Sequence, residues 1–312
     1  MQNQYLPEGS LISNVENHEY ISSIPMLEKA MEKQKILEST AILCDNKFQL
    51  HIDLHGIKGI MPRNEVQYLR DGEETKDIAV LTRVGKPICF KVVGFMRNEY
   101  GELCAYLSRR AAQLECMNNY IDALVPGDII PSRITHMESF GAFVDIGCGI
   151  VSLLSIDCIS VSRISHPKDR FNVGEKIYTV VKNIDADKRI YVTHRELLGT
   201  WQENAELFSA GQTVAGIIRS IESYGIFVEL MPNLAGLAEL KTGVEINQTA
   251  AVYIKSIIPD KMKIKLIVID TNSEVSSSNK AIKYFVDTQK TSHIDSWRYS
   301  PESTSKIIET VF

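Results

Sequence analysis

The stretch SFGAFVDIG, residues Ser139–Gly147, decides the fold, because the chain repeats its pattern as SYGIFVEL at Ser223–Leu230. The two copies stand 84 residues apart, and this offset holds without a gap from the pair Gly127 and Gly211 through position 230. In each copy, aliphatic residues alternate with an aromatic residue and a carboxylate, which is the period of a β-strand with one face in a core. We therefore expect four side chains on the outer, solvent-exposed strand faces: Phe143, Asp145, Phe227 and Glu229.

A weaker third copy lies upstream, in KFQLHIDLHGIKGIMPRNEV at residues 47–66. Leu50, Ile52 and Leu54 alternate there with His51 and Asp53. Further strands are predicted downstream in every copy, including a paired hairpin within residues 84–110. About five short strands per copy are typical of a small closed barrel. The sequence therefore predicts a mainly all-β chain with three tandem five-stranded barrels, short helical linkers and a C-terminal extension.

The connecting segments differ in kind. Residues 26–38 have charged neighbours four apart and predict a helix. Residues 194–208 predict a helical link interrupted at Gly199, and residues 271–280 form a polar, serine-rich linker. Near the end, Pro301 suits the first position of a helix whose apolar residues share one face, and Trp297 is expected to anchor this segment on the last barrel.

Composition narrows the classes of function. Net charge is −5, and the six cysteines are scattered without a C-x-x-C pair, as expected for reduced thiols in a cytoplasmic protein. We find no secretory signal and no apolar run long enough for a membrane span. His51, Asp53 and His55 share a strand face but are interpreted as surface residues rather than metal ligands. No catalytic motif is present, so we expect neither an enzyme nor a cofactor or small-molecule substrate.

The repeated motifs resemble the S1 RNA-binding domain, a five-stranded OB-type barrel. The resemblance rests on GDIIPSRITHMESFGAFVDIG with VGEKIYTVVKNIDADKRIYVTHR in the middle copy, and on GQTVAGIIRSIESYGIFVEL in the last. It extends over roughly residues 36–270, and the chain is similar to shortened bacterial S1-like proteins of three repeats. The predicted organisation begins with an N-terminal segment (1–35), a degenerate barrel (36–117) and an S1 barrel (118–198). A helical linker (199–207), a last S1-like barrel (208–271) and a polar C-terminal extension (272–312) follow.

The resemblance implies a set of RNA-binding residues. The family face carries one aromatic residue in the turn before the second strand, one on that strand, a histidine after the third strand, and an aspartate and an arginine around the last hairpin. By position, the middle copy supplies Phe140, Phe143, Asp185 and Arg189, but has Ser155 in place of the histidine. The last copy supplies Tyr224, Phe227 and Lys263, with Glu239 and Pro259 as departures. The first copy keeps Phe48 and has His51, Pro62 and Cys104 at other contact positions, so its RNA binding is doubtful.

The acidic net charge speaks against a protein that binds nucleic acid mainly through a basic surface. Stacking of bases on aromatic side chains does not depend on net charge. Local cations near the middle barrel can then contact phosphates, and the candidates are Arg163, Lys168, Arg170, Lys182, Lys188 and Arg189. Arg189 with Asp185 could equally form only a salt bridge within a turn.

These observations predict a protein that binds single-stranded RNA, in particular messenger RNA, through its middle and last barrels. The resemblance to S1-like proteins implies the small ribosomal subunit as a partner and a role in translation, with no membrane involved. The alternative is a protein-interaction scaffold that uses its barrels without direct RNA contact. Net charge and the missing family histidine favour the scaffold, whereas the aromatic pairs in two barrels favour RNA.

Overall fold

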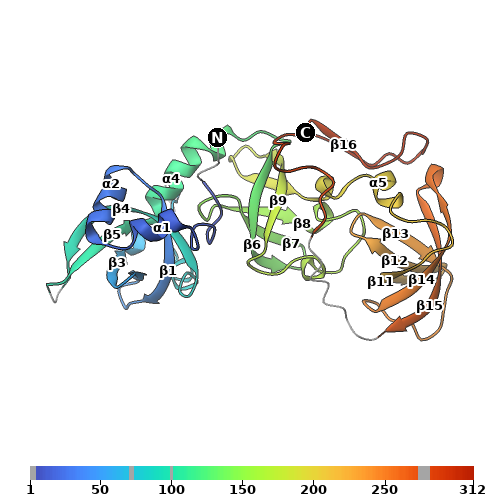
Figure 1. Ribbon diagram of the computed structural model, residues 1–312, viewed down its shortest axis with the longest axis horizontal. Helices are drawn as coiled ribbons and strands as arrows, with labels where there is room; N and C mark the ends of the chain where they lie inside the picture. The colour runs from blue at the N-terminus through green and yellow to red at the C-terminus, as the bar shows by residue number, and fades with distance from the viewer. Residues whose placement is uncertain (1–4, 70–73, 99–100, 273–281) are drawn as a thin grey trace. The chain divides into compact units, whose positions relative to one another are not determined.

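The computed structural model describes residues 5–69, 74–98, 101–272 and 282–312. Contacts divide the chain into two compact units. Unit 1 holds the residues up to Leu124 together with 131–133 and 145–151, and unit 2 holds the remainder up to Phe312. Figure 1 shows both units and labels many of their elements.

The first barrel lies in unit 1 and closes in the strand order β1-β2-β3-β5-β4. Alternation explains its core, because Leu50, Ile52 and Leu54 of β2 are all buried inside it. Helical segments surround the barrel. The elements are α1 (Val15–Tyr20), α2 (Ile24–Glu32), β1 (Leu37–Cys44), β2 (Leu50–Leu54), β3 (Ile57–Met61), η1 (Arg63–Glu65), α3 (Asp77–Leu81), β4 (Pro87–Arg97), β5 (Leu103–Ser108), α4 (Arg109–Asn119) and η2 (Ile121–Ala123).

The middle and last barrels supply most of unit 2 and repeat the same strand order. The middle barrel contains β6 (Ile129–Glu138), β7 (Gly141–Asp145), β8 (Val151–Ser155), η3 (Ile156–Cys158), η4 (Pro167–Asp169), β9 (Lys176–Ile184) and β10 (Ile190–Thr193). The last barrel contains β11 (Thr213–Glu222), β12 (Gly225–Met231), β13 (Leu234–Ala238), β14 (Thr249–Ile258), η6 (Pro259–Lys261) and β15 (Lys263–Asn272). The prediction of three tandem five-stranded barrels is confirmed.

The helical connectors agree with the sequence only in part. The helix expected over residues 26–38 ends at Glu32, because Leu37 and Ala41 belong to β1 and are buried in the barrel core. The link after the middle barrel follows the prediction, with η5 (Arg195–Leu198) separated from α5 (Trp201–Ala205) at Gly199. Gly199 has φ +81°, a conformation that favours glycine, so the break between the two helices is encoded locally.

The C-terminal segment folds as a hairpin, so the helix predicted from Pro301 is wrong. Strand β16 (Ser296–Arg298) pairs with β17 (Glu309–Val311), and Trp297 lies opposite Thr310. The β-branched Thr310 and Val311 favour an extended backbone once a partner strand is present. The predicted serine-rich linker lies almost wholly outside the described residues.

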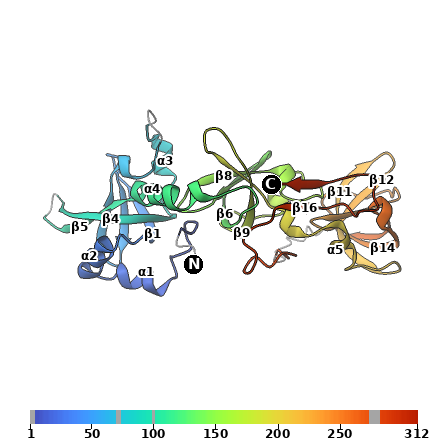
Figure 2. The same ribbon diagram turned by 90° about the horizontal axis from the view of Figure 1, so that it is seen from above.

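Trp297 confirms its predicted role as an anchor on the last barrel. Its side chain is buried in a cluster with Trp201 of α5 and core residues of the last barrel. In Figure 2, β16 lies close to α5, and the Trp201 amide donates a hydrogen bond to the Tyr299 carbonyl at 3.0 Å. The hairpin is therefore part of the hydrophobic packing of unit 2.

Two carboxylates differ from the sequence expectation. Asp145 and Glu229 point out of their barrels as predicted, but other segments cover both, and neither is exposed. In unit 1, Asp145 accepts hydrogen bonds from the backbone amides of Glu8, Gly147 and Gly149. In unit 2, Glu229 pairs with Arg170 and Arg219 at 2.6 and 2.7 Å. Strand periodicity cannot reveal these covers, because they come from distant segments.

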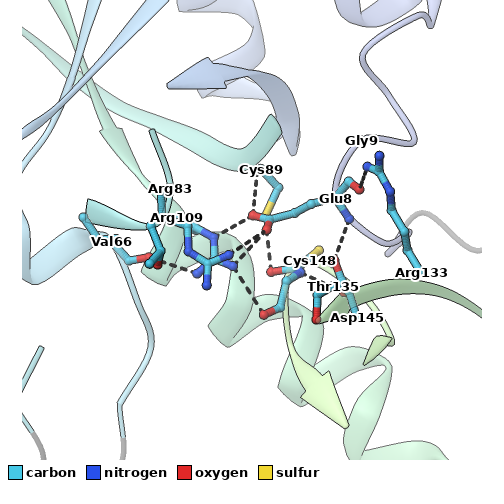
Figure 3. A network of polar contacts seen from close by, with 12 residues as sticks. Glu8, Gly9, Val66, Arg83, Cys89, Arg109, Arg133, Thr135, Asp145 and Cys148 are labelled. Carbon is cyan, nitrogen blue, oxygen red and sulfur yellow. Dashed lines mark hydrogen bonds and ion pairs between the residues drawn. The ribbon is translucent and has the colours of Figure 1, made fainter. Parts of the chain in front are cut away.

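Unit 1 contains a buried polar network centred on Glu8 and Arg109 (Figure 3). The Glu8 carboxylate accepts from Arg109 Nε at 2.6 Å and Nη2 at 3.0 Å, and from the Cys89 amide. Although burial opposes ionisation, Arg109 holds the pKa of Glu8 below its ordinary value. Burial and the neighbouring Glu8 charge instead raise the pKa of Asp145. Nearby, Glu38 Oε2 accepts the amides of Gly9 and Leu11, which ties the N-terminal segment to β1.

Unit 1 is expected to lose stability as pH rises from about 5 to 8. Burial raises the pKa of Glu38 to about 7, so the folded state binds this proton more tightly than the unfolded chain does. The loss approaches about 3 kcal/mol above pH 7. Glu8 adds no pH dependence of stability between pH 5 and 8. Its pKa is lowered by folding, so its contribution to stability is already complete above the pKa that it has in the unfolded chain. Asp145, whose pKa is also raised, adds a loss of the same sign. Glu38→Gln keeps an oxygen acceptor but removes one of these two titrations, and should make the pH dependence shallower.

The measurement is urea unfolding by far-UV circular dichroism, restricted to the transition that tryptophan fluorescence does not report. Both tryptophans, Trp201 and Trp297, lie in unit 2, so this transition belongs to unit 1. Glu32→Gln, at an exposed position of α2, is the matched control. An unchanged pH slope in Glu38→Gln would contradict the assignment.

Trp297→Ala should lower the free energy of unfolding of the last barrel by about 3 kcal/mol, because it leaves a cavity in a packed cluster. The remaining Trp201 reports on the same cluster, so urea unfolding followed by its fluorescence measures the effect directly. Ile307→Ala, at a position 59% exposed in the same segment, should change stability by about 0.5 kcal/mol or less. Equal effects of the two substitutions would argue against the anchoring role.

Candidate nucleic-acid interface

Two aromatic pairs recur with the same geometry on the outer faces of the middle and last barrels. Phe140 precedes β7 and meets Phe143 edge-to-face, with ring centroids 6.0 Å apart and an interplanar angle of 90°. Tyr224 and Phe227 repeat this arrangement before and on β12, at 6.1 Å and 90°. The turn rings are open to solvent, with Phe140 55% and Tyr224 67% exposed. The strand rings are half-buried.

Strand register places each strand aromatic in a transverse row of outward-facing side chains, here called the outer row. In the last barrel, Ser220 on β11 lies opposite Phe227, and Phe227 lies opposite Leu237 on β13. Leu237 in turn lies opposite Lys265 on β15. The row thus crosses four strands and provides a floor on which a planar base can rest beside a cation.

The outer row of the middle barrel contains two aromatic residues that the sequence analysis missed. His136 of β6 stacks on Phe143 at 6.1 Å with an interplanar angle of 24°, and its side chain is 62% exposed. Tyr191 of β10 lies opposite Leu153 of β8, which corresponds to Lys265 opposite Leu237 in the last barrel. Strict alternation from Ile134 would turn His136 inward, but the alternation of β6 breaks here, because Ile134 and Met137 are both buried. Tyr191 is identified only by cross-strand register.

A glycine begins the second strand of both barrels because the next strand runs too close for a side chain. A Cβ on Gly141 would stand 2.5 Å from the Leu154 carbonyl oxygen, and one on Gly225 would stand 2.6 Å from that of Ala238. Distances below about 3 Å are not tolerated between such atoms. The close approach sets where the turn ends and the strand begins, and this brings the two rings of each pair onto one face.

A groove of about 520 Å³ runs beside the aromatic pair of the last barrel. Tyr224 and Phe227 line it, and so does Lys263, which the sequence analysis selected. Lys255 and Lys265 add further positive charge to its walls, against the single carboxylate of Glu239. Glu239 stands 3.8 Å from Lys255, so the groove keeps a positive balance.

The last hairpin of the middle barrel separates the roles of Asp185 and Arg189. One oxygen of Asp185 accepts the Arg189 amide at 2.8 Å, and the other accepts the Tyr191 hydroxyl at 3.3 Å. These hydrogen bonds, led by the one from the Arg189 amide, lower the pKa of Asp185. The Arg189 guanidinium stays 63% exposed and lies 3.9 Å from Asp187. Asp185 therefore organises the turn, and Arg189 extends toward solvent.

The other predicted cations occupy different environments. Arg163, Lys168 and Lys182 are exposed, and Lys182 Nζ lies 3.1 Å from Cys158 Sγ. Arg170 has a side chain only 8% exposed and is engaged with Glu229. In this arrangement Arg170 contributes to the packing of unit 2 and has no open face for a phosphate.

The first barrel departs from the other two at its turn aromatic. Phe48 packs against the barrel core, and the Arg63 guanidinium covers its ring at 5.1 Å. Cys104 is fully buried. His51 occupies the strand position, partly exposed, and pairs with Asp45 at 3.0 Å. The ring pair of the other barrels is therefore not formed here.

The described ranges contain no group of three or more His, Cys, Asp or Glu residues that could hold a metal ion. His55 contacts His18 at 3.1 Å, and all six cysteines are free thiols. No helix in the part of the chain that the structure describes is long and apolar enough to cross a membrane.

The fold and the outer rows define a protein of tandem OB-type barrels with aromatic outer faces. Residues 124–195 match the family model of the S1 RNA binding domain. The small ribosomal subunit protein bS1 homolog of Bacillus subtilis is 26% identical over 291 residues, which cover 89% of this chain and 71% of that protein. The homolog of Bacillus cereus is also 26% identical, over 82% of this chain and 65% of that protein.

These matches confirm the resemblance to the bacterial S1-like family, and the family model coincides with the middle barrel. The chain spans about two thirds of the length of these curated relatives. A crystal structure of a multidomain protein with nucleic acid binding domains from Streptococcus pneumoniae aligns over 76% of this chain and 73% of that chain, at 15% identity and a TM-score of 0.24.

Proposed function

We propose that this chain binds single-stranded RNA, in particular messenger RNA, on the outer faces of its middle and last barrels. The observation that carries the proposal is the repeated edge-to-face ring pair, at 6.0 and 6.1 Å, with one exposed ring in each pair. Single-stranded RNA exposes the faces of its bases, and stacking on aromatic side chains contributes about 1–3 kcal/mol per base. Two ring pairs provide platforms for several bases.

The distribution of charge supports RNA as the ligand despite the net charge of −5. Lys255, Lys263 and Lys265 surround the ring pair of the last barrel, and Arg189 extends from the middle barrel. The carboxylates two residues after the strand rings, Asp145 and Glu229, are buried and hydrogen-bonded or ion-paired, and the exposed Glu138 pairs with His136. A phosphate chain on these faces therefore meets cations.

Unit 2 keeps the middle and last barrels together. Asn233, in the turn between β12 and β13, donates to the carbonyls of Arg195 and Gly199 and accepts the Val161 amide. The C-terminal segment adds the Trp297 anchor. When two sites are tethered, the second binds at a high effective concentration, so individually weak platforms add up to useful avidity.

The relatives extend the proposal to a cellular role. Their names assign them to the small ribosomal subunit. We place this chain likewise in translation, as a non-catalytic cytoplasmic protein that holds messenger RNA near the small subunit. Co-sedimentation with 30S particles in a sucrose gradient, with and without ribonuclease, tests the ribosomal part of the proposal.

Phe143→Ala and Phe227→Ala should each weaken binding of an unstructured 20-nucleotide RNA by about tenfold, because each removes one stacking platform. The dependence on salt should stay the same, since no cation is lost. Filter binding at four salt concentrations measures both quantities, and Leu207→Ala, at an exposed apolar position after α5, serves as the control. Unchanged affinity in both aromatic variants would contradict the proposal and favour the scaffold.

Arg189→Ala should act differently, by reducing the slope of log affinity against log salt by about 0.7, the value for one phosphate contact on a single strand. The same filter-binding series gives this slope. Lys290→Ala removes a positive charge from a side chain that is 85% exposed on the C-terminal segment and should leave the slope as it is. Equal slopes for wild type and Arg189→Ala would remove Arg189 from the interface.

A further inference from the structure

The first barrel carries a groove that the proposed function leaves unused. It has a volume of about 810 Å³ and is formed by β1, β2, β3 and the β4–β5 hairpin. His51, Ile60 and Tyr106 line its floor, and Lys58 and Arg97 lie on its walls. Because the first barrel lacks the ring pair, the proposed function assigns no binding site to it.

Register shows that this groove occupies the same place as the groove of the last barrel. His51 lies opposite Ile60, and Ile60 lies opposite Tyr106. These pairings reproduce the row from Phe227 through Leu237 to Lys265. The preceding glycines, Gly59 and Gly236, line the two grooves as well. The first barrel therefore has a complete outer row with different residues in it.

The first barrel places its rings at other positions in the row. Phe48 is withdrawn under Arg63, and the planar groups at the groove are the half-buried rings of His51 on β2 and Tyr106 on β5. Asp45 orients the His51 ring, because its Oδ2 atom lies 3.0 Å from Nε2 of the imidazole. The two rings flank the aliphatic Ile60, and this leaves a floor with an aromatic group on each side.

The groove walls carry charges of both signs. Lys47, Lys58 and Arg97 line the groove together with Asp45 and Asp53, and Lys58 also pairs with the exposed Glu102 at 2.5 Å. Asp45 is engaged with the His51 ring and with the Lys47 and Gln49 amides. The barrel is closed, so it offers no free strand edge to which an extended peptide could add. Planar rings beside cations suit a nucleobase with its phosphates better than a peptide.

We propose that the groove of the first barrel is a third binding site for single-stranded nucleic acid, in which Tyr106 and His51 stack on bases and Lys58 and Arg97 approach phosphates. The inference rests on the proposed function, because it assigns to the first barrel the same class of ligand. It gives each of the three barrels its own RNA site, with the first site built on β5 rather than on the turn before β2.

The test uses the full chain and a ten-nucleotide RNA that carries 4-thiouridine and a fluorescent label. A background variant replaces Phe140, Phe143, Tyr224 and Phe227 with Ala and so disables the other two sites. This variant should retain binding measurable by fluorescence anisotropy. Photocrosslinked peptides, mapped by mass spectrometry, should include Leu103–Ser108 of β5 in both the background and the wild-type chain.

Adding Tyr106→Ala to the background should weaken the residual binding by about tenfold, whereas Tyr106→Phe, which keeps the ring, should not. Ile78→Ala, at an exposed apolar position of α3 outside the groove, is the control. If the wild-type chain binds RNA but no crosslink maps to β2 or β5 and Tyr106→Ala changes nothing, this inference alone is overturned. If the wild-type chain does not bind RNA at all, the proposed function fails together with it.

Discussion

The cross-strand register of the second and third strands is the constraint on which every candidate site depends. Pairing of Phe227 with Leu237 puts the ring outside while Ile226 and Val228 fill the core. A shift by one residue would turn the ring inward and expose the aliphatic residues. The close approach at Gly141 and Gly225 limits the chain to this arrangement, because a side chain there would separate the strands. Core packing and ring display are thus two results of the same pairing.

The covered carboxylates explain how an acidic chain can offer a surface to RNA. Asp145 and Glu229 follow the strand rings by two residues and would repel phosphates if they were exposed. Backbone amides bind Asp145, and two arginines bind Glu229, so neither charge faces solvent. Net charge is therefore a poor measure of the potential at the outer rows, because in the groove of the last barrel three lysines stand against the single carboxylate of Glu239.

Much of the architecture could be predicted from the sequence, because the repeat and the strand alternation are local signals. The same signals located Phe143 and Phe227, and the resemblance to the S1 domain added Phe140 and Tyr224. They could not reveal that Arg170 is engaged by Glu229, because that contact joins segments distant in sequence. Tyr106 and Tyr191 were missed for the same reason, since their place in a row depends on pairing with the third strand. The C-terminal hairpin was missed because β16 supplies the partner that makes β17 a strand.

The central claim is that rings on the outer rows stack directly on RNA bases. Aromatic proton NMR of a chain with labelled phenylalanine and tyrosine, titrated with a short unstructured RNA, tests it most directly. The account predicts upfield ring-current shifts for Phe140, Phe143, Tyr224 and Phe227 that saturate with the binding isotherm. Saturated binding with the resonances of all four rings unmoved would contradict it.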